Sequence, residues 1–289
     1  MPTLYVVATP IGNLGDLSPN AVETLRSVAL IAAEDTRVTQ KLVNVFELGT
    51  PLTSYHAHNE RGRAAQLIQR MLAENIDIAL TTDAGTPCIS DPGSVLVQEA
   101  AQAGIKVVAV AGPSAMAAAL SVSGFPVEEF TFFGFLPRTK GELKEKLLDM
   151  AMRSRLAVVH ESPHRVIGLL QCVRDLLPGT QVSASCDLTK KHELTVRGVV
   201  GDVLGNLLAN PKANKGEYCL VFLWAQEDIP TQQGAASALS QEARLFDGLM
   251  AGLSLRESME KLIGEGERKN AVYAASLRVK EKLREDALQ

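Results

Sequence analysis

The sequence contains no run of about 18 apolar residues, so we expect no membrane-spanning segment. Its first apolar stretch, residues 3–8, is too short for the core of a signal peptide, and we expect a cytoplasmic protein. The four cysteines are scattered through apolar stretches without a C-x-x-C pair: Cys88, Cys172, Cys186 and Cys219. This spacing predicts reduced, buried thiols rather than disulfides or a zinc site.

The chain also has no excess of positive charge. Its 289 residues include 29 Lys and Arg against 33 Asp and Glu, a formal net charge of −4 at pH 7. The whole chain therefore carries no nucleic-acid-binding signature, and any RNA contact needs a local basic patch. The loop at residues 9–16 contains glycine but is neither a G-x-G-x-x-G fingerprint nor a Walker loop with its lysine, so nothing here favours a nucleoside triphosphate.

Apolar strands alternate with amphipathic helices along the first half of the chain. Strands are predicted at residues 4–8, 30–33, 76–80 and 105–110, and each is followed by a helical pattern. This alternation predicts an α/β fold with a mainly parallel sheet, whose loops after the strands meet at one edge.

The length of the chain favours two domains, and a break at Gly124 predicts the boundary between them. We expect an N-terminal α/β domain over residues 1–124 and a second α/β domain, with a mixed sheet, over residues 125–226. A polar linker at 226–240 precedes a small helical module over residues 240–289. That module is the basic end of the chain and resembles a helix-turn-helix-like RNA or DNA contact module, although a solvated helical appendage fits equally well. Its basic residues are Arg256, Lys261, Arg268, Lys269, Arg278, Lys280, Lys282 and Arg284.

The loop at residues 83–93 is the strongest candidate for a ligand site, because it follows a buried strand and contains two glycines and two prolines. Two polar clusters accompany it. Glu34, Asp35 and Arg37 come directly after the second strand, and His56 lies near Asn59 in the segment 54–61. A His-x-His pair without a third ligand at a diagnostic spacing does not define a metal site, and we expect none.

Several of these loops together resemble one known family. The matching segments, in chain order, are LYVVATPIGNLGD (4–16), AEDTR (33–37), YHAHN (55–59), DAGTPCISDPG (83–93), AGPSA (111–115), GFLP (134–137), ESPHR (161–165) and KGE (215–217). Each motif is weak by itself, but the ordered set is similar to the ribosomal RNA small subunit methyltransferase I group of the tetrapyrrole methylase superfamily. Cys186-Asp187 stands where the group usually has Arg-Glu, which leaves the role of that loop open.

The resemblance implies two α/β domains of the tetrapyrrole methylase type, with S-adenosylmethionine folded in the cleft between them. It also implies 2'-O-methylation of a cytidine ribose in the decoding region of 16S rRNA, on the small ribosomal subunit, by a homodimer. The cofactor-binding residues that we carry over, or assign to the same loops, are Pro10, Gly12, Asp83, Gly85, Thr86, Ile89, Gly112, Ser114, Ala115, Glu161 and Glu217. Asp83 has an alternative role in bonding its own loop.

Methyl transfer to a ribose hydroxyl requires in-line alignment and removal of the hydroxyl proton, and it needs neither a metal nor a covalent nucleophile. The residues that we assign to this chemistry are Glu34, Asp35, Arg37, His56 and Asn59. The residue types alone do not identify the base. Two other functions stay open: a tetrapyrrole C-methyltransferase on the same fold, and a non-catalytic regulator that binds the cofactor or RNA. The polar segment 54–61 and the basic tail favour RNA.

Overall fold

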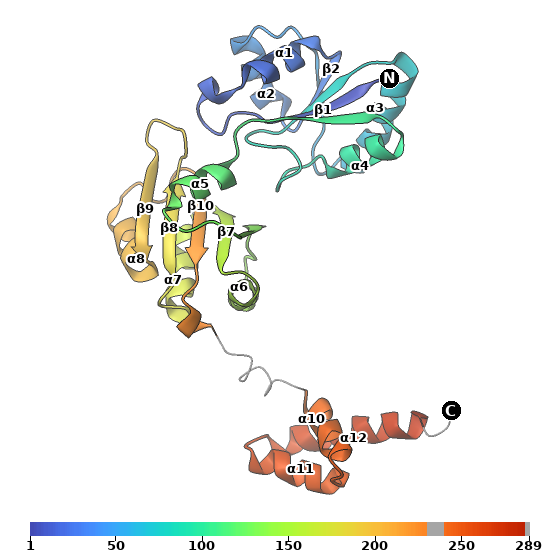
Figure 1. Cartoon of the computed structure of the whole chain (residues 1–289), viewed down its shortest axis with the longest axis vertical. Helices are drawn as coiled ribbons and strands as arrows, with labels where there is room; N and C mark the ends of the chain where they lie inside the picture. Colours follow the sequence, from blue (N-terminus) through green and yellow to red (C-terminus); the bar gives the residue numbers. More distant parts are fainter. Residues whose placement is uncertain (230–239, 287–289) are drawn as a thin grey trace. The chain divides into compact units, whose positions relative to one another are not determined.

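The computed structural model describes residues 1–229 and 240–286, with side chains described as far as residue 280. The chain forms two compact units, residues 1–229 and 230–289. The first unit contains two five-stranded sheets, and the second contains helices (Figure 1). Of the linker expected at 226–240, Gln226–Asp228 forms a short 3-10 helix, η2, and residues 230–239 lie outside the described part of the chain.

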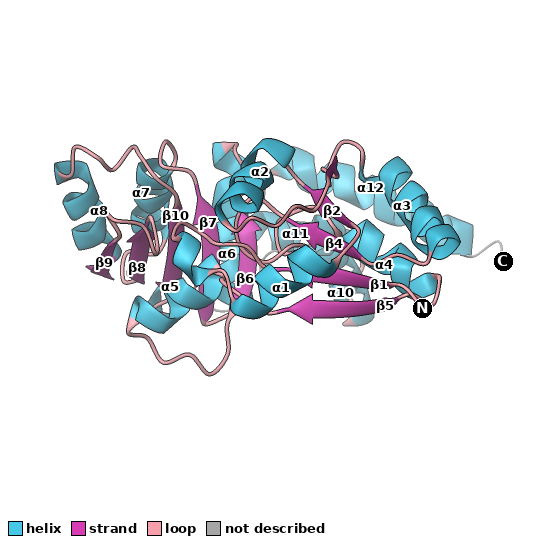
Figure 2. Cartoon of the chain, turned by 90° about the horizontal axis from the view of Figure 1, so that it is seen from above, coloured by secondary structure: helices cyan, strands magenta, loops and turns pink. Residues whose placement is uncertain are grey.

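The first sheet is entirely parallel, in the order β3-β2-β4-β1-β5 (Figure 2). Its strands are β1 (Thr3–Val7), β2 (Leu30–Ala33), β3 (Leu52–Ser54), β4 (Ile78–Thr81) and β5 (Lys106–Val110). Its helices are α1 (Pro19–Ser27), α2 (Thr36–Val45), α3 (Glu60–Glu74) and α4 (Ser94–Gln102), and η1 (Leu14–Asp16) is a 3-10 turn. The parallel sheet is confirmed. The three-residue edge strand β3 was not expected, because it is too short to show a period.

Both faces of this sheet are covered, because successive residues of a strand point to opposite sides. Leu30 and Ala32 pack in a core with α3 and α4, whereas Ile31 between them packs in a core with α1. Ser18 caps helix α1 by accepting a hydrogen bond from the Ala21 N–H at 3.1 Å, and Pro19 occupies the first turn of the helix.

The second sheet is mixed, in the order β6-β7-β10-β8-β9, and only the β6–β7 pair is parallel. Its strands are β6 (Thr131–Phe135), β7 (Leu156–Glu161), β8 (Gln181–Cys186), β9 (Leu194–Val199) and β10 (Tyr218–Leu223). The associated helices are α5 (Ala115–Ser123), α6 (Lys140–Arg153), α7 (Val166–Leu176) and α8 (Val200–Ala209). Helices α6, α7 and α8 cover one face, around a core that includes Leu147, Leu170 and Leu204.

Helix α5 covers the other face of the second sheet, although it precedes the boundary expected at residue 124. Its Ala119 and Leu120 share a core with Val158 of β7 and Val221 of β10 (Figure 1). Ile11, from the loop after β1, joins the same core, so residues of both sheets meet there. The division of the chain into residues 1–124 and 125–226 stays a prediction.

The described part of the second unit, residues 240–286, is a three-helix module: α10 (Gln241–Met250), α11 (Leu255–Gly264) and α12 (Lys269–Asp286). The three helices enclose a small apolar core that includes Leu245, Leu262 and Val272. Two of the basic side chains expected to face RNA form ion pairs with glutamates of the same module: Arg278 with Glu242, and Arg256 with Glu260. The side chains of Lys282 and Arg284 lie outside the described part.

None of the described helices combines the length and apolar character needed to cross a bilayer. The four cysteines are free thiols, as expected, but only Cys186 and Cys219 are buried, while Cys88 and Cys172 are half-buried. Within residues 1–229 and 240–280 there is no group of three potential metal ligands.

Candidate functional site

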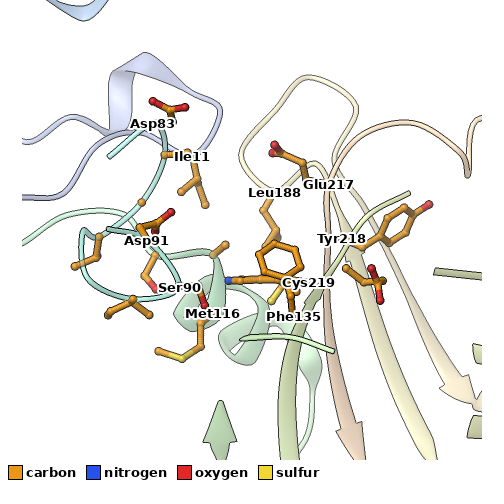
Figure 3. Close-up of a pocket in the computed structure, with 18 of the residues that line it drawn as sticks. Ile11, Asp83, Ser90, Asp91, Met116, Phe135, Leu188, Glu217, Tyr218 and Cys219 are labelled. Atoms are coloured by element: carbon orange, nitrogen blue, oxygen red, sulfur yellow. The ribbon is translucent and has the colours of Figure 1, made fainter. Parts of the chain in front are cut away.

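A cavity of about 420 Å³ opens within the first unit, where loops from the carboxyl ends of several strands meet (Figure 3). Ile11, Glu34 and residues 83–86 and 89–91 line it from the first sheet, and Ser114, Ala115 and Met116 from the start of α5. Phe135, residues 160–163, 187–188 and 217–219 line it from the second sheet. This is the position at which open α/β sheets bind ligands.

The loop at residues 82–93 is held in a fixed shape by the loop after β1. The backbones of Thr9 and Gly85 exchange two hydrogen bonds, at 2.8 and 3.0 Å, and the Thr9 hydroxyl donates to the Thr82 carbonyl at 3.0 Å. Within the loop, Cys88 and Ser90 both have positive φ angles, of 71° and 66°. Non-glycine residues rarely adopt this conformation, and such strain is concentrated at functional sites.

Three residues expected to bind the cofactor, Pro10, Gly12 and Gly112, do not line the cavity. The two glycines instead permit close packing behind it. A Cβ on Gly112 would lie 2.9 Å from the Ala8 Cβ, and one on Gly12 would lie 2.4 Å from Lys190 Cγ. Gly12 thereby lets the loop after β1 contact the loop after β8, where the Asn13 N–H donates to the Thr189 hydroxyl at 3.1 Å.

Three carboxylates gather on the first-sheet side of the cavity: Glu34, Asp83 and Asp91. Glu34 Oε2 accepts hydrogen bonds from the Thr82 hydroxyl and from the Asp83 N–H at 3.2 Å. Burial, reinforced by the negative charge of Glu34, raises the pKa of Asp91 to about 6 and also raises the pKa of Asp83. Asp83 in addition accepts a hydrogen bond from the Asp35 N–H at 3.0 Å, which joins it to the segment after β2 and not to its own loop.

Three further carboxylates line the second-sheet side: Glu161, Asp187 and Glu217. Glu161 is only 2% exposed, and burial raises the pKa of its carboxyl. Its Oε1 accepts a hydrogen bond from the Ser162 N–H at 2.7 Å, but its buried Oε2 has no hydrogen-bond partner, although Arg165 Nη2 lies 3.3 Å away. Glu161 Oε2 thus has an ion-pair partner in Arg165 but no hydrogen bond, so it can still accept one from a ligand donor.

These side chains fit S-adenosylmethionine. The cavity is lined by six carboxylates and by no lysine or arginine. Its apolar surface is supplied by side chains such as Ile11, Met116 and Leu188. Asp187 and Glu217 pair with Lys190, at 2.8 and 3.0 Å, so the unpaired negative charge of the lining lies mainly on the first-sheet carboxylates. A ligand that carries a sulfonium and an ammonium is attracted to these carboxylates, and the lining offers a polyphosphate no lysine or arginine. The unpartnered Glu161 Oε2 is matched to an ammonium or hydroxyl donor.

Of the five residues assigned to catalysis, Glu34 alone lines the cavity. Asp35 and Arg37 pair at 2.6 Å, and this contact lowers the pKa of Asp35 to about 2. The Arg37 side chain is 88% exposed. His56 and Asn59 contact each other, since the backbone N–H of His56 donates to Asn59 Oδ1 at 2.9 Å. Neither residue lines the cavity.

The structure adds lining residues that were not selected from the sequence, chiefly Asp91, Phe135 and His160. Asp91 lies in the very loop that was selected, and Phe135 and His160 lie in or beside matched motifs. Their side-chain types did not single them out, because a phenylalanine or histidine at the end of an apolar strand is most often part of the core. The eight selected cofactor residues other than Pro10, Gly12 and Gly112 are all brought together in the lining.

The fold and the acidic cavity define a known class. Residues 3–204 match the family of Tetrapyrrole (Corrin/Porphyrin) Methylases, and the chain belongs to that family. The structure is similar to diphthine synthase, with a TM-score of 0.60 and 13% identity, over 78% of this chain and 90% of that one. It is also similar to the methyltransferase CobJ, with a TM-score of 0.56 and 17% identity, over 78% and 94%. Both likenesses concern the fold, and the expected fold class is confirmed.

Curated relatives narrow the class further. The Bacillus subtilis (strain 168) relative is 37% identical over 262 residues, 90% of this chain and 89% of its own length. The Pseudomonas aeruginosa relative is 39% identical over 278 residues, 95% of this chain and 96% of its own. Both are named "Ribosomal RNA small subunit methyltransferase I". The family resemblance seen in the sequence is therefore confirmed.

Proposed function

We propose that the protein transfers a methyl group from S-adenosylmethionine to 16S rRNA of the small ribosomal subunit, at the 2'-hydroxyl of a cytidine in the decoding region. The observation that carries the proposal is the cavity lined by six carboxylates and by no lysine or arginine, which suits a cationic methyl donor. The names of the relatives support the RNA substrate. The choice of cytidine and of its 2'-oxygen rests on the resemblance of the sequence motifs.

In this proposal Glu161 accepts a hydrogen bond from a polar group of the bound cofactor through its unpartnered Oε2. Asp83, Gly85, Thr86 and Ile89 enclose the cofactor from the first sheet, and Ser114, Ala115 and Glu217 complete the enclosure. The cofactor supplies an activated methyl group. The rigid loop around it aligns that methyl group with the incoming oxygen, and such alignment contributes effective molarities on the order of 10^5 M or more.

The ribose hydroxyl must lose its proton, and we propose Glu34 as the acceptor because it lines the cavity and is held by Thr82. Arg37, exposed and oriented by Asp35, is suited to contact a phosphate beside the target nucleotide. For His56 and Asn59 we propose a supporting role through the segment that joins them to Glu60. A well-placed proton acceptor accelerates such a step by roughly 10² to 10⁴-fold.

The alternative substrate is a tetrapyrrole. The structure of uroporphyrin-III-C-methyltransferase from Thermus thermophilus has a TM-score of 0.50 and 20% identity to this chain, which is a likeness of the fold. A uroporphyrinoid carries several carboxylates, and the acidic cavity disfavours such an anion near the methyl donor. The lining is thus better suited to a neutral ribose hydroxyl.

The test is methyl transfer from labelled S-adenosylmethionine to small ribosomal subunits that lack the modification, with uroporphyrinogen as the parallel substrate. We expect label in 16S rRNA, and nucleoside mass spectrometry should identify 2'-O-methylcytidine. Label in the tetrapyrrole would establish the alternative. Cofactor binding without transfer to either substrate would favour a regulator.

The cellular site and the assembly are part of the same proposal. We propose a cytoplasmic homodimer, because small ribosomal subunits are the expected substrate and the resemblance implies a dimer. Sedimentation velocity of the full chain tests the assembly, and a monomer at micromolar concentration contradicts it.

A further inference from the structure

Phe135 is an exposed aromatic ring at the edge of the cavity. It is 63% exposed, the most exposed of the large apolar side chains that line the cavity, and it projects from the end of β6. Figure 3 shows it on the second-sheet side of the cavity, across from Ser90 and Asp91. An exposed aromatic ring at the edge of this cavity offers a flat apolar surface to a ligand that enters it.

A bulge in β6 directs this ring toward the cavity. Phe132 pairs with Val158 and Phe135 with His160, so the chain advances by three positions along β6 but by only two along β7. In a regular strand, residues three apart face opposite sides of the sheet. Here Phe132 and Phe135 both contact the His160 ring, with centroid distances of 5.0 and 5.8 Å. Bulges next to active sites commonly re-aim a side chain in this way.

The bulge is fixed on both sides. Gly134 has a φ of +61°, and a Cβ there would lie 2.9 Å from the Ser90 Oγ, so β6 closely approaches the loop at residues 82–93. Beyond Phe135, Arg165 donates hydrogen bonds to the carbonyls of Leu136 at 3.1 Å and Pro137 at 2.7 Å. The ring is therefore presented on a rigid backbone next to the loop at residues 82–93.

The charges around the ring suit one side of an RNA nucleotide. The lining contains no lysine or arginine to bind a phosphate, and its first-sheet carboxylates Glu34, Asp83 and Asp91 disfavour one. The exposed Arg138 and Lys140 lie just beyond Phe135 in the sequence and offer positive charge outside it. Burial lowers the pKa of His160, which favours a neutral imidazole beside the ring.

We infer that Phe135, presented by the β6 bulge, is the platform on which the base of the target nucleotide stacks while its ribose reaches the methyl donor. This inference rests on the proposed RNA methylation. Stacking of a base on an aromatic side chain is tolerant of sequence and needs an unstacked nucleotide, as when enzymes act on an extruded base. The Phe135 ring thus positions the substrate and takes no part in proton transfer.

The test compares four variants of the full-length protein: Phe135→Ala, Phe135→Leu, Phe135→Trp and the control Phe130→Ala, which is also exposed but does not line the cavity. Methyl transfer to small ribosomal subunits lacking the modification is measured as kcat and KM, and S-adenosylmethionine affinity by calorimetry. We expect Phe135→Ala and Phe135→Leu to raise the KM for the subunit about tenfold or more. Phe135→Trp and Phe130→Ala should stay near wild type, and cofactor affinity should be unchanged throughout.

Three results would overturn the inference. Phe135→Ala could methylate as well as wild type, it could lose cofactor affinity as strongly as it loses transfer, or it could change the sedimentation coefficient of the protein. The second result would assign the ring to the adenine of the cofactor, and the third to contact with a second copy of the chain. Failure of the wild-type protein to methylate the subunit would instead refute the proposed function.

Discussion

Glu60 Oε1 accepts a hydrogen bond from the backbone N–H of Gly93 at 2.8 Å, which joins the start of α3 to the end of the loop at residues 82–93. The same oxygen accepts a hydrogen bond from the Tyr55 hydroxyl at 3.3 Å, and that hydroxyl in turn accepts one from the Leu96 N–H at 3.2 Å. Tyr55 is fully buried. The polar segment at residues 54–61 therefore stabilises the end of the loop at residues 82–93.

Replacing Glu60 by alanine should loosen that loop. We expect the free energy of unfolding to fall by roughly 1–3 kcal/mol, because the N–H of Gly93 loses a charged partner. Cofactor affinity should fall with it, and both quantities are measurable by denaturation and calorimetry. The matched control is Glu74→Ala on the same helix, since Glu74 pairs with Arg70 in solvent, and its effect should stay within about 0.5 kcal/mol. Equal effects of the two substitutions contradict the supporting role.

Gly93 itself should tolerate no side chain. Its φ is +135°, and a Cβ would lie 2.6 Å from Leu80 Cδ2 and 2.7 Å from the Cys88 Sγ. Gly93→Ala should therefore destabilise the protein by roughly 3 kcal/mol or more, as steric overlap adds to backbone strain. Gly104 also has a positive φ, of +71°, but faces open space. Gly104→Ala should cost only about 1 kcal/mol, and denaturant midpoints will separate the two.

The pKa of Asp91, raised to about 6 by burial and by Glu34, predicts a pH dependence of cofactor binding. A cationic ligand favours the ionised carboxylate, so affinity for S-adenosylmethionine should rise with pH from 5 to 7, by up to about tenfold. Calorimetric titration across this range checks the slope. Asp91→Asn should remove most of it, and an unchanged slope in that variant excludes Asp91 as its source.

The same shift has the opposite consequence for the ligand-free protein. The folded state holds the Asp91 proton up to about pH 6, whereas the unfolded chain releases it near the ordinary pKa of 3.8. The stability that this group contributes is therefore fully present below pH 3.8 and is lost as pH rises through 6. Asp91→Asn should be more stable than wild type at pH 7 by about 1–2 kcal/mol, after allowance for solvent screening. The difference should vanish below pH 4.

Glu34 and His56 should differ in kinetics. Glu34→Gln retains the shape of the side chain, and we expect kcat to fall by roughly 10² to 10⁴-fold with cofactor affinity little changed. His56→Ala should lower kcat far less, because His56 lies outside the cavity lining. Single-turnover methylation of small ribosomal subunits measures both. A larger loss in His56→Ala than in Glu34→Gln reverses the assignment.

Removal of the three-helix module should separate RNA binding from cofactor binding. The module has its own core and forms its own compact unit, so a chain ending at residue 229 should fold. We expect that chain to keep its S-adenosylmethionine affinity and to methylate small subunits more weakly. Loss of cofactor affinity in the truncated protein would show that the helices serve the cavity instead.

Much of the fold follows from local patterns. The short continuous apolar run of strands such as β2, the Ser18 cap with Pro19, and the glycine-rich ends of strands each act over a few residues, so they are visible in the sequence. The loop at residues 83–93 was found for the same reason. The three-residue β3 was missed because it shows no period and depends on its pairing with β2.

The site depended on contacts that no local pattern encodes. Sequence motifs by themselves determined the family, the α/β class and most of the residues through which the loop at 83–93 lines the cavity. Only the tertiary structure decided that Pro10, Gly12, Gly112, His56 and Asn59 lie outside the cavity lining. It also brought Asp91 beside Glu34 and turned Phe135 toward the cavity. The physical reason is that burial, charge proximity and a bulge in β6 arise from segments far apart in the chain, and these set each pKa and side-chain direction.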